Sequence, residues 1–166
     1  YVNAKTKKLQ FSKNIDLKKE FLKMIENEEN KPYLDKIYYS FSQALLNSDS
    51  LQLAKKYLNS SVRENSTDKD LKSKVYINLF ELNFNASEYL LAGKYLDSAL
   101  NVIDKKSREF WTLDRQKKGI EKVVNIEANL LLWDSLLKIS NYDKEKLNKV
   151  LNDVLDSRTV TNTGTR

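Results

Sequence analysis

One ten-residue segment occurs twice in this chain and constrains its fold more than any other feature. Residues 53–62 read LAKKYLNSSV and residues 91–100 read LAGKYLDSAL, so six of the ten positions are identical. The same offset of 38 residues aligns Ile37 with Val75 and Phe41 with Leu79. A fixed period of ~20–50 residues is typical of stacked supersecondary units, none of which can bury its apolar face alone. The sequence therefore predicts repeated helix pairs.

The spacing inside the repeated segment resembles that of the tetratricopeptide repeat. In each copy, two small residues and a leucine between them share one helix face: Ala54, Leu58, Ser61 and Ala92, Leu96, Ala99. The second helix of a tetratricopeptide unit has the same A-x3-F spacing, in a period of about 34 residues. The four extra residues per period fall in the loop at 63–72. We therefore expect an all-α, tetratricopeptide-like superhelix (solenoid) of about three helix pairs with a C-terminal capping region.

Apolar periodicity and capping residues divide the chain into predicted helices. A degenerate first pair covers 1–12 and 16–27, with Asp16 as N-cap. The second pair covers 33–47 and 50–65, and the third covers 69–84 and 87–105. We expect Ser48 or Asp49 to cap the helix from 50, and Ser87 to cap the helix that begins there. Joints this short make the two helices of a pair antiparallel.

The repeat weakens after residue 105. A helical stripe continues to about Leu131, Asp134 is expected to begin a short helix to Ser140, and Asp143 is expected to cap a last helix. We interpret Trp111 and Trp133 as core or cap anchors. The predicted organisation is a repeat domain at 1–156 and a disordered tail or linker at 157–166.

The composition argues against an enzyme. There is no Cys and no His, which removes thiol chemistry, the usual zinc ligands and the commonest general base. The three Gly residues are isolated, so no phosphate-binding loop is present. We therefore predict no catalytic residues, no metal site and no cofactor. No apolar run is long enough to span a membrane.

The net charge of +6 suggests nucleic acid as a partner, but the distribution of the charges does not. Lysines occur in short groups along the whole chain, and acidic residues lie near each group. A nucleic-acid site would gather them into one patch. The pattern favours a solvated helix surface, and we predict no nucleic-acid binding.

The tetratricopeptide resemblance also implies a docking surface. In such arrays the first helices line a concave face, and their facing positions correspond here to Lys36, Tyr39, Gln43, Leu46, Lys74, Ile77, Glu81 and Phe84. Apolar groups with a polar rim on such a face would form a docking groove for a protein. The alternative is that the last helices fold back and cover this face.

A narrower resemblance rests on segments 22–25, 32–39, 95–99 and 134–138. In this order they resemble the tetratricopeptide lipoproteins of Bacteroidetes associated with gliding motility and type IX secretion, called SprE or PorW. The resemblance covers roughly residues 16–155. It implies a periplasmic, outer-membrane-associated scaffold that binds other proteins of the secretion complex. It also implies a lipid anchor outside this fragment, since the chain has no Cys.

A second class of function fits the same helices. The chain begins at Tyr1 without a visible signal peptide, so we expect it to be a processed or excised piece of a longer protein. Such a piece could belong to a periplasmic repeat sensor or to a glycan-binding module with tetratricopeptide helices. A transmembrane helix with an output domain downstream would favour the sensor, and clustered exposed tryptophans on loops would favour the glycan binder.

Overall fold

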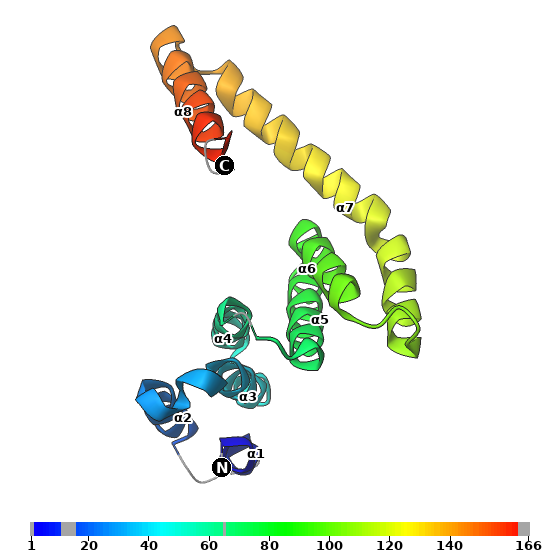
Figure 1. The fold of residues 1–166 in the computed structure, drawn as a ribbon. Coiled ribbons are helices and arrows are strands. Elements are labelled where there is room, and N and C mark those ends of the chain that lie inside the picture. The colour runs from blue at the N-terminus through cyan, green and yellow to red at the C-terminus, as the bar shows by residue number, and fades with distance from the viewer. Residues whose placement is uncertain (1, 11–15, 65, 163–166) are drawn as a thin grey trace. The chain divides into compact units, whose positions relative to one another are not determined.

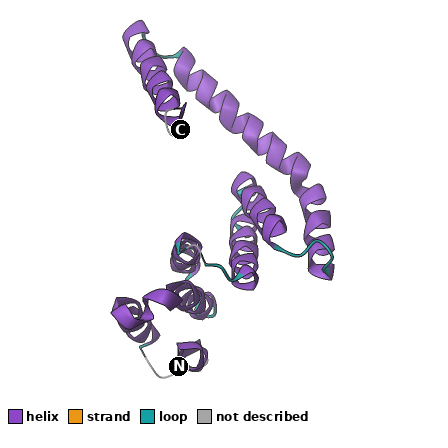
Figure 2. Cartoon of the chain, in the orientation of Figure 1, coloured by secondary structure: helices purple, strands orange, loops and turns teal. Residues whose placement is uncertain are grey.

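All secondary structure in the described part of the chain is helical. The structure is a computed structural model that describes residues 2–10, 16–64 and 66–162. Its elements are α1 (Val2–Gln10), α2 (Leu17–Glu26), the 3-10 helix η1 (Glu28–Tyr33), α3 (Leu34–Leu46), α4 (Leu51–Arg63), α5 (Lys69–Asn85), α6 (Tyr89–Val102), α7 (Arg108–Ser140) and α8 (Lys144–Asn162) (Figure 1). No strand occurs in these ranges, as Figure 2 shows. The predicted all-α class is confirmed.

The chain divides into two compact units between Val124 and Asn125. The first unit contains α1 to α6 and the first half of α7, and the second contains the rest of α7 and α8. The first unit holds the buried apolar clusters. In one of them, Phe21 of α2 stacks on Phe41 of α3 with ring centroids 4.7 Å apart. Among residues 125–154 of the second unit, none is buried.

The turns inside the pairs α3–α4 and α5–α6 repeat at the same 38-residue offset as the sequence. Asp49 and Ser87 both adopt a left-handed backbone, with φ of 57° and 61°. The residue after each, Ser50 or Glu88, donates its N–H to the carbonyl five positions back at 2.9 Å. A left-handed residue with this six-to-one bond is a Schellman-type helix end. The repeat therefore extends from sequence to backbone conformation.

This turn geometry corrects the predicted caps of the second helices. Ser50 and Glu88 occupy the N-cap positions of α4 and α6, and neither side chain makes a capping hydrogen bond. Asp49 and Ser87 lie one residue too early, because the helix end before them requires their left-handed backbone. Ser48 donates its hydroxyl back to the last turn of α3.

Other local predictions are confirmed. Asp16 caps α2 by accepting from the N–H of Lys19 at 3.3 Å, and Asp143 accepts from the N–H of Lys146 at 2.8 Å at the start of α8. The shared stripes of the second helices are buried: Ala54, Leu58, Ser61, Ala92, Leu96 and Ala99. The break that separates the predicted helices at 1–12 and 16–27 lies outside the described residues.

Helix α7 departs from the prediction. It runs without interruption from Arg108 to Ser140, so Asp134 does not begin a new helix. The following Ser135 donates its hydroxyl to the carbonyl of Leu131 at 2.8 Å and is satisfied within the helix. The interpretation of both tryptophans as core or cap anchors is wrong, because Trp111 and Trp133 are exposed. Helix α8 continues to Asn162, five residues beyond 157, where the predicted tail begins.

Candidate protein-docking surface

A polar hollow lies in the first unit where α1, α3 and the start of α5 meet. Its volume is about 410 Å³. The residues that line it are Thr6, Lys7, Lys36, Tyr39, Ser40, Asp68, Asp70, Leu71 and Lys74. Three of the predicted docking residues, Lys36, Tyr39 and Lys74, are therefore brought together at one place.

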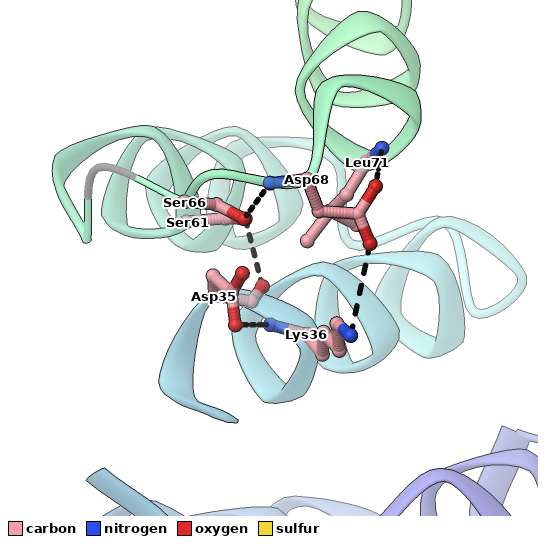
Figure 3. Close-up of polar contacts among 6 residues, drawn as sticks. All are labelled: Asp35, Lys36, Ser61, Ser66, Asp68 and Leu71. Carbon is pink, nitrogen blue, oxygen red and sulfur yellow. Dashed lines mark hydrogen bonds and ion pairs between the residues drawn. The ribbon is translucent and has the colours of Figure 1, made fainter. Parts of the chain in front are cut away.

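Asp68 fixes the start of α5 against α3 at the edge of this hollow (Figure 3). Its Oδ1 accepts the N–H of Leu71 at 3.1 Å and so caps α5. Its Oδ2 lies 3.6 Å from Nζ of Lys36, a contact between two partly exposed side chains. Ser66 supports the turn by accepting the N–H of Asp68 at 3.1 Å. The head group of Lys36 is thereby held near the mouth of the hollow.

The beginning of α3 is held from its other side by α4. The hydroxyl of Ser61 donates to the carbonyl of Asp35 at 2.8 Å, and this bond is buried (Figure 3). The Asp35 carboxylate accepts the N–H of Lys36 at 2.7 Å. The bond from Ser61 is costly to break, because its buried hydroxyl would lose its partner without gaining water. The backbone that carries Lys36 is therefore well supported.

Tyr39 forms part of the wall of the hollow. Its ring packs against the cluster of Leu58, Leu71, Val75 and Leu79. Burial raises the pKa of its hydroxyl above the usual value near 10, while a hydrogen bond with Asn78 acts in the opposite direction. The side chain is half-buried. Tyr39 thus joins α3 to α5 and offers a partner only part of its surface.

The charges around the hollow are mixed, with lysine in excess. Lys7 and Lys74 are exposed, and among the side chains that the structure describes neither belongs to an ion pair. Together with Lys36 they face the carboxylates of Asp68 and Asp70. This arrangement suits a polar segment that can both accept hydrogen bonds from lysine and donate to aspartate.

A second hollow of about 370 Å³ lies between the end of α5 and the first half of α7, lined by Phe80, Glu81, Phe84, Asn85, Gln116 and Ile120. It contains the predicted residues Glu81 and Phe84. Phe84 is 38% exposed and meets the ring of Tyr89 edge-on at 5.5 Å. An exposed aromatic beside a hollow can anchor a partner side chain.

The three remaining predicted residues line neither hollow. Leu46 packs against the core formed by α1 to α4, and Ile77 packs against the core between α5, α6 and α7. Gln43 is half-buried, and its Nε2 has no hydrogen-bond partner among the described residues. The first half of α7 contributes Phe110 and Ile120 to the cluster around Ile77. The alternative of a covered face therefore applies to Ile77, whereas Phe84 remains exposed.

Sequence reasoning missed the contribution of α1. Thr6 and Lys7 complete the polar hollow because α1 packs beside α3, with Val2 and Leu9 buried in the same cluster as Ile37. The signal was the weak apolar periodicity before residue 12, which identified a helix but not its face. The degenerate first pair included this helix, but the 38-residue offset from Lys36 points to a position before Tyr1, so no facing residue could be assigned in it.

Comparison with known proteins gives no family for this chain, so the candidate site is assigned from its residues alone. Within the described ranges, no three Asp or Glu side chains are grouped as metal ligands. None of the helices in those ranges combines the length and apolar character needed to cross a bilayer. Neither the family models nor the curated proteins give a match to this chain.

Proposed function

We propose that the chain is a non-catalytic scaffold module with a tetratricopeptide-like solenoid architecture. It binds a protein partner on the row of first helices α1, α3 and α5. The observation that carries this proposal is the polar hollow, in which Lys36, Tyr39 and Lys74 from two successive first helices come together with Lys7 of α1. The 38-residue repeat of the helix-pair turns supports the same architecture.

The partners we propose are proteins of a type IX secretion and gliding motility complex. This part of the proposal rests on the sequence resemblance of residues 16–155 to the tetratricopeptide lipoproteins of that machinery. The same resemblance is the basis for a periplasmic, outer-membrane-associated location with a lipid anchor outside these residues. The role is then structural: the module holds partners together without chemistry of its own.

Co-purification with the components of the secretion complex tests the proposal. Lys7→Glu with Lys74→Glu reverses two exposed charges of the hollow, and Phe84→Ala removes the aromatic of the second hollow. Lys105→Glu with Lys106→Glu is the matched control, because it reverses two exposed charges after α6, away from both hollows. We expect loss of the secretion proteins with the hollow variants and retention with the control, with circular dichroism unchanged in all. Retention by all three variants would contradict the proposal.

A further inference from the structure

The second unit exposes a large apolar surface. Ten large apolar side chains of this unit are exposed: Ile126, Leu130, Leu131, Leu132, Trp133, Leu136, Leu137 and Ile139 of α7, with Leu151 and Val154 of α8. Since each is about half exposed, they leave roughly 1,000 Å² of apolar surface in water. The largest single apolar patch on a typical monomer is ~300–600 Å², and this surface reaches that range even when it is divided between two sides of α7. Apolar surface of this extent often marks a site of interaction.

The second half of α7 is apolar on two sides. Ile126, Leu130, Trp133 and Leu137 follow one another at intervals of four, three and four residues and so form one stripe. A second stripe, on another side of the helix, contains Leu132, Leu136 and Ile139. A helix with two apolar sides packs against two neighbours. Helix α8 turns back after Asn141–Asp143 (Figure 1), but it does not lie closely along α7 and leaves most of both apolar sides uncovered.

The repeated motif shows that one of these sides has the composition of a packing face. Ala128, Leu132 and Ser135 have the same spacing as Ala54, Leu58 and Ser61 of α4. In α4 and in α6 these positions are buried between neighbouring helices, and both leucines are fully inaccessible. In α7, Leu132 is 53% exposed. A face that is buried twice in the first unit therefore lacks its partner in the second.

We propose that the partner is a second copy of this chain. The two hairpins, each made of the second half of α7 and of α8, pack against each other with their turns at opposite ends to form a four-helix bundle. A stable interface buries ~800 Å² per partner, and the interfaces of permanent homodimers are apolar. The exposed apolar side chains of one hairpin supply a large part of this area. In the bundle each α7 lies between α8 of its own chain and a helix of the second copy, so both of its apolar sides gain a neighbour.

Net charge favours self-association of this unit. Residues 125–166 contain six basic and six acidic residues, so the excess of six positive charges lies entirely in residues 1–124. A neutral segment meets no net electrostatic repulsion when it pairs with its own copy.

The order of the charges selects the arrangement of the two copies. When α7 and α8 of one chain close into an antiparallel hairpin, Lys138 near the end of α7 comes level with Lys146 near the start of α8, so like charges meet. Asp153 is seven residues further along, about 10 Å away along the axis. When the turns lie at opposite ends, α7 runs parallel to α8 of the second copy, and the register that centres the two hairpins on each other brings Lys138 level with that copy's Asp153. Asp134 similarly lies level with Lys149 of the second copy. The head-to-tail dimer thus pairs opposite charges.

Sedimentation equilibrium of the full chain tests the dimer. We expect twice the chain mass of 19.4 kDa for the wild type. Leu130→Glu with Leu137→Glu places two carboxylates in one stripe and should reduce the mass to that of one chain. Leu51→Glu is the matched control, because Leu51 is 49% exposed on α4 in the first unit and should leave the dimer intact.

A charge exchange tests the arrangement without disturbing the apolar stripes. Lys138→Glu alone should weaken the dimer roughly tenfold, since two symmetric pairs of opposite charges become pairs of like charges. Adding Asp153→Lys should restore the wild-type dissociation constant. Restoration would not be expected from contacts within one chain, where these two residues lie at different levels.

Two results would overturn the inference. The first is a wild-type mass of one chain at all concentrations up to ~0.1 mM, which would leave the apolar surface to a different protein. The second is a dimer that survives Leu130→Glu with Leu137→Glu but is lost with Leu51→Glu, which would place the interface in the first unit. Failure of Asp153→Lys to rescue Lys138→Glu would overturn the head-to-tail arrangement. Loss of the secretion partners in the hollow variants is independent of all three results.

Discussion

At the scale of single residues, two glycines inside helices have different surroundings. A Cβ added at Gly119 of α7 would meet no other atom within 4 Å. Because glycine costs about 1 kcal/mol relative to alanine in a helix interior, Gly119→Ala should raise the free energy of unfolding by about that amount. Urea denaturation followed by circular dichroism measures the change.

Gly93 of α6 is the matched control for that substitution. A Cβ there would lie 3.1 Å from Cγ2 of Val124, so the helix-propensity gain is offset by a close contact between α6 and α7. We expect Gly93→Ala to stabilise the protein less than Gly119→Ala. Equal gains from both would contradict the close approach of α6 to Val124.

Asn83 is a buried residue in the position that Leu45 occupies in the preceding helix pair. Its amide donates to the carbonyl of Leu79, while its Oδ1 has no hydrogen-bond partner among the described residues. A buried acceptor without a partner costs about 1–3 kcal/mol. Asn83→Leu removes this cost with the same number and branching of side-chain heavy atoms and should raise the free energy of unfolding by about 1 kcal/mol. Calorimetry would show a higher Tm; a lower Tm would indicate that the amide is needed for packing.

Tyr39 predicts a loss of stability at alkaline pH. Burial raises the pKa of its hydroxyl above the unfolded value near 10, so the proton is held more tightly in the folded chain. The corresponding stability is fully present below about pH 10 and is lost as the pH rises through the folded pKa. Tyr39→Phe should therefore flatten the decline in unfolding free energy above pH 10. The same substitution at Tyr33, which is exposed, is the control; an equal flattening there would contradict the assignment.

At the scale of elements, the repeat made most of the first unit predictable. The positions of α3, α4, α5 and α6 agree with the predicted pairs to within a few residues, since the small-residue stripes require a neighbouring helix. The caps at Ser50 and Glu88 were not predictable from residue preference. They depend on the left-handed residues before them, which a sequence pattern does not reveal.

Ala92 tests the helix crossing in the second of these pairs. It is fully buried on α6, as is Ala54 at the equivalent place on α4. Ala92→Leu adds volume to a closed contact and should lower the free energy of unfolding by about 1–3 kcal/mol. Lys94→Leu, on the exposed side of the same helix, should change it by less than about 0.5 kcal/mol. Equal effects in thermal unfolding would show that the crossing tolerates larger side chains.

Helix α7 shows where sequence patterns lose resolution. Asp134 is a common N-cap residue, but no Gly or Pro lies nearby to end the preceding helix. A single helix keeps every backbone hydrogen bond of residues 125–140, whereas a break would need caps that the sequence does not provide. The exposure of Trp133 follows from the same continuity, because no element of its own unit covers that side.

At the scale of the whole molecule, five of the residues named by the repeat register line hollows, but the register did not show that they fall into two groups. Lys36, Tyr39 and Lys74 line one hollow because their helices begin beside each other, and Asp68 ties these beginnings together. Glu81 and Phe84 line a different hollow, about two to three turns beyond Lys74 along α5. The single concave row expected from the register did not distinguish the two, since it contained no information on where α7 would pack.

The two units should also differ in local stability, and the difference should depend on concentration. The first unit has a buried core, whereas none of residues 125–154 is buried, so the hairpin alone is expected to open easily. Pairing with a second copy would stabilise it by mass action. Hydrogen–deuterium exchange of the full chain should therefore show protection of residues 125–140 that increases with protein concentration. Protection of α4 and α6 should stay constant. In the Leu130→Glu with Leu137→Glu variant, residues 125–140 should exchange rapidly at every protein concentration. If their protection in the wild type did not depend on concentration, the hairpin would be stable without a partner.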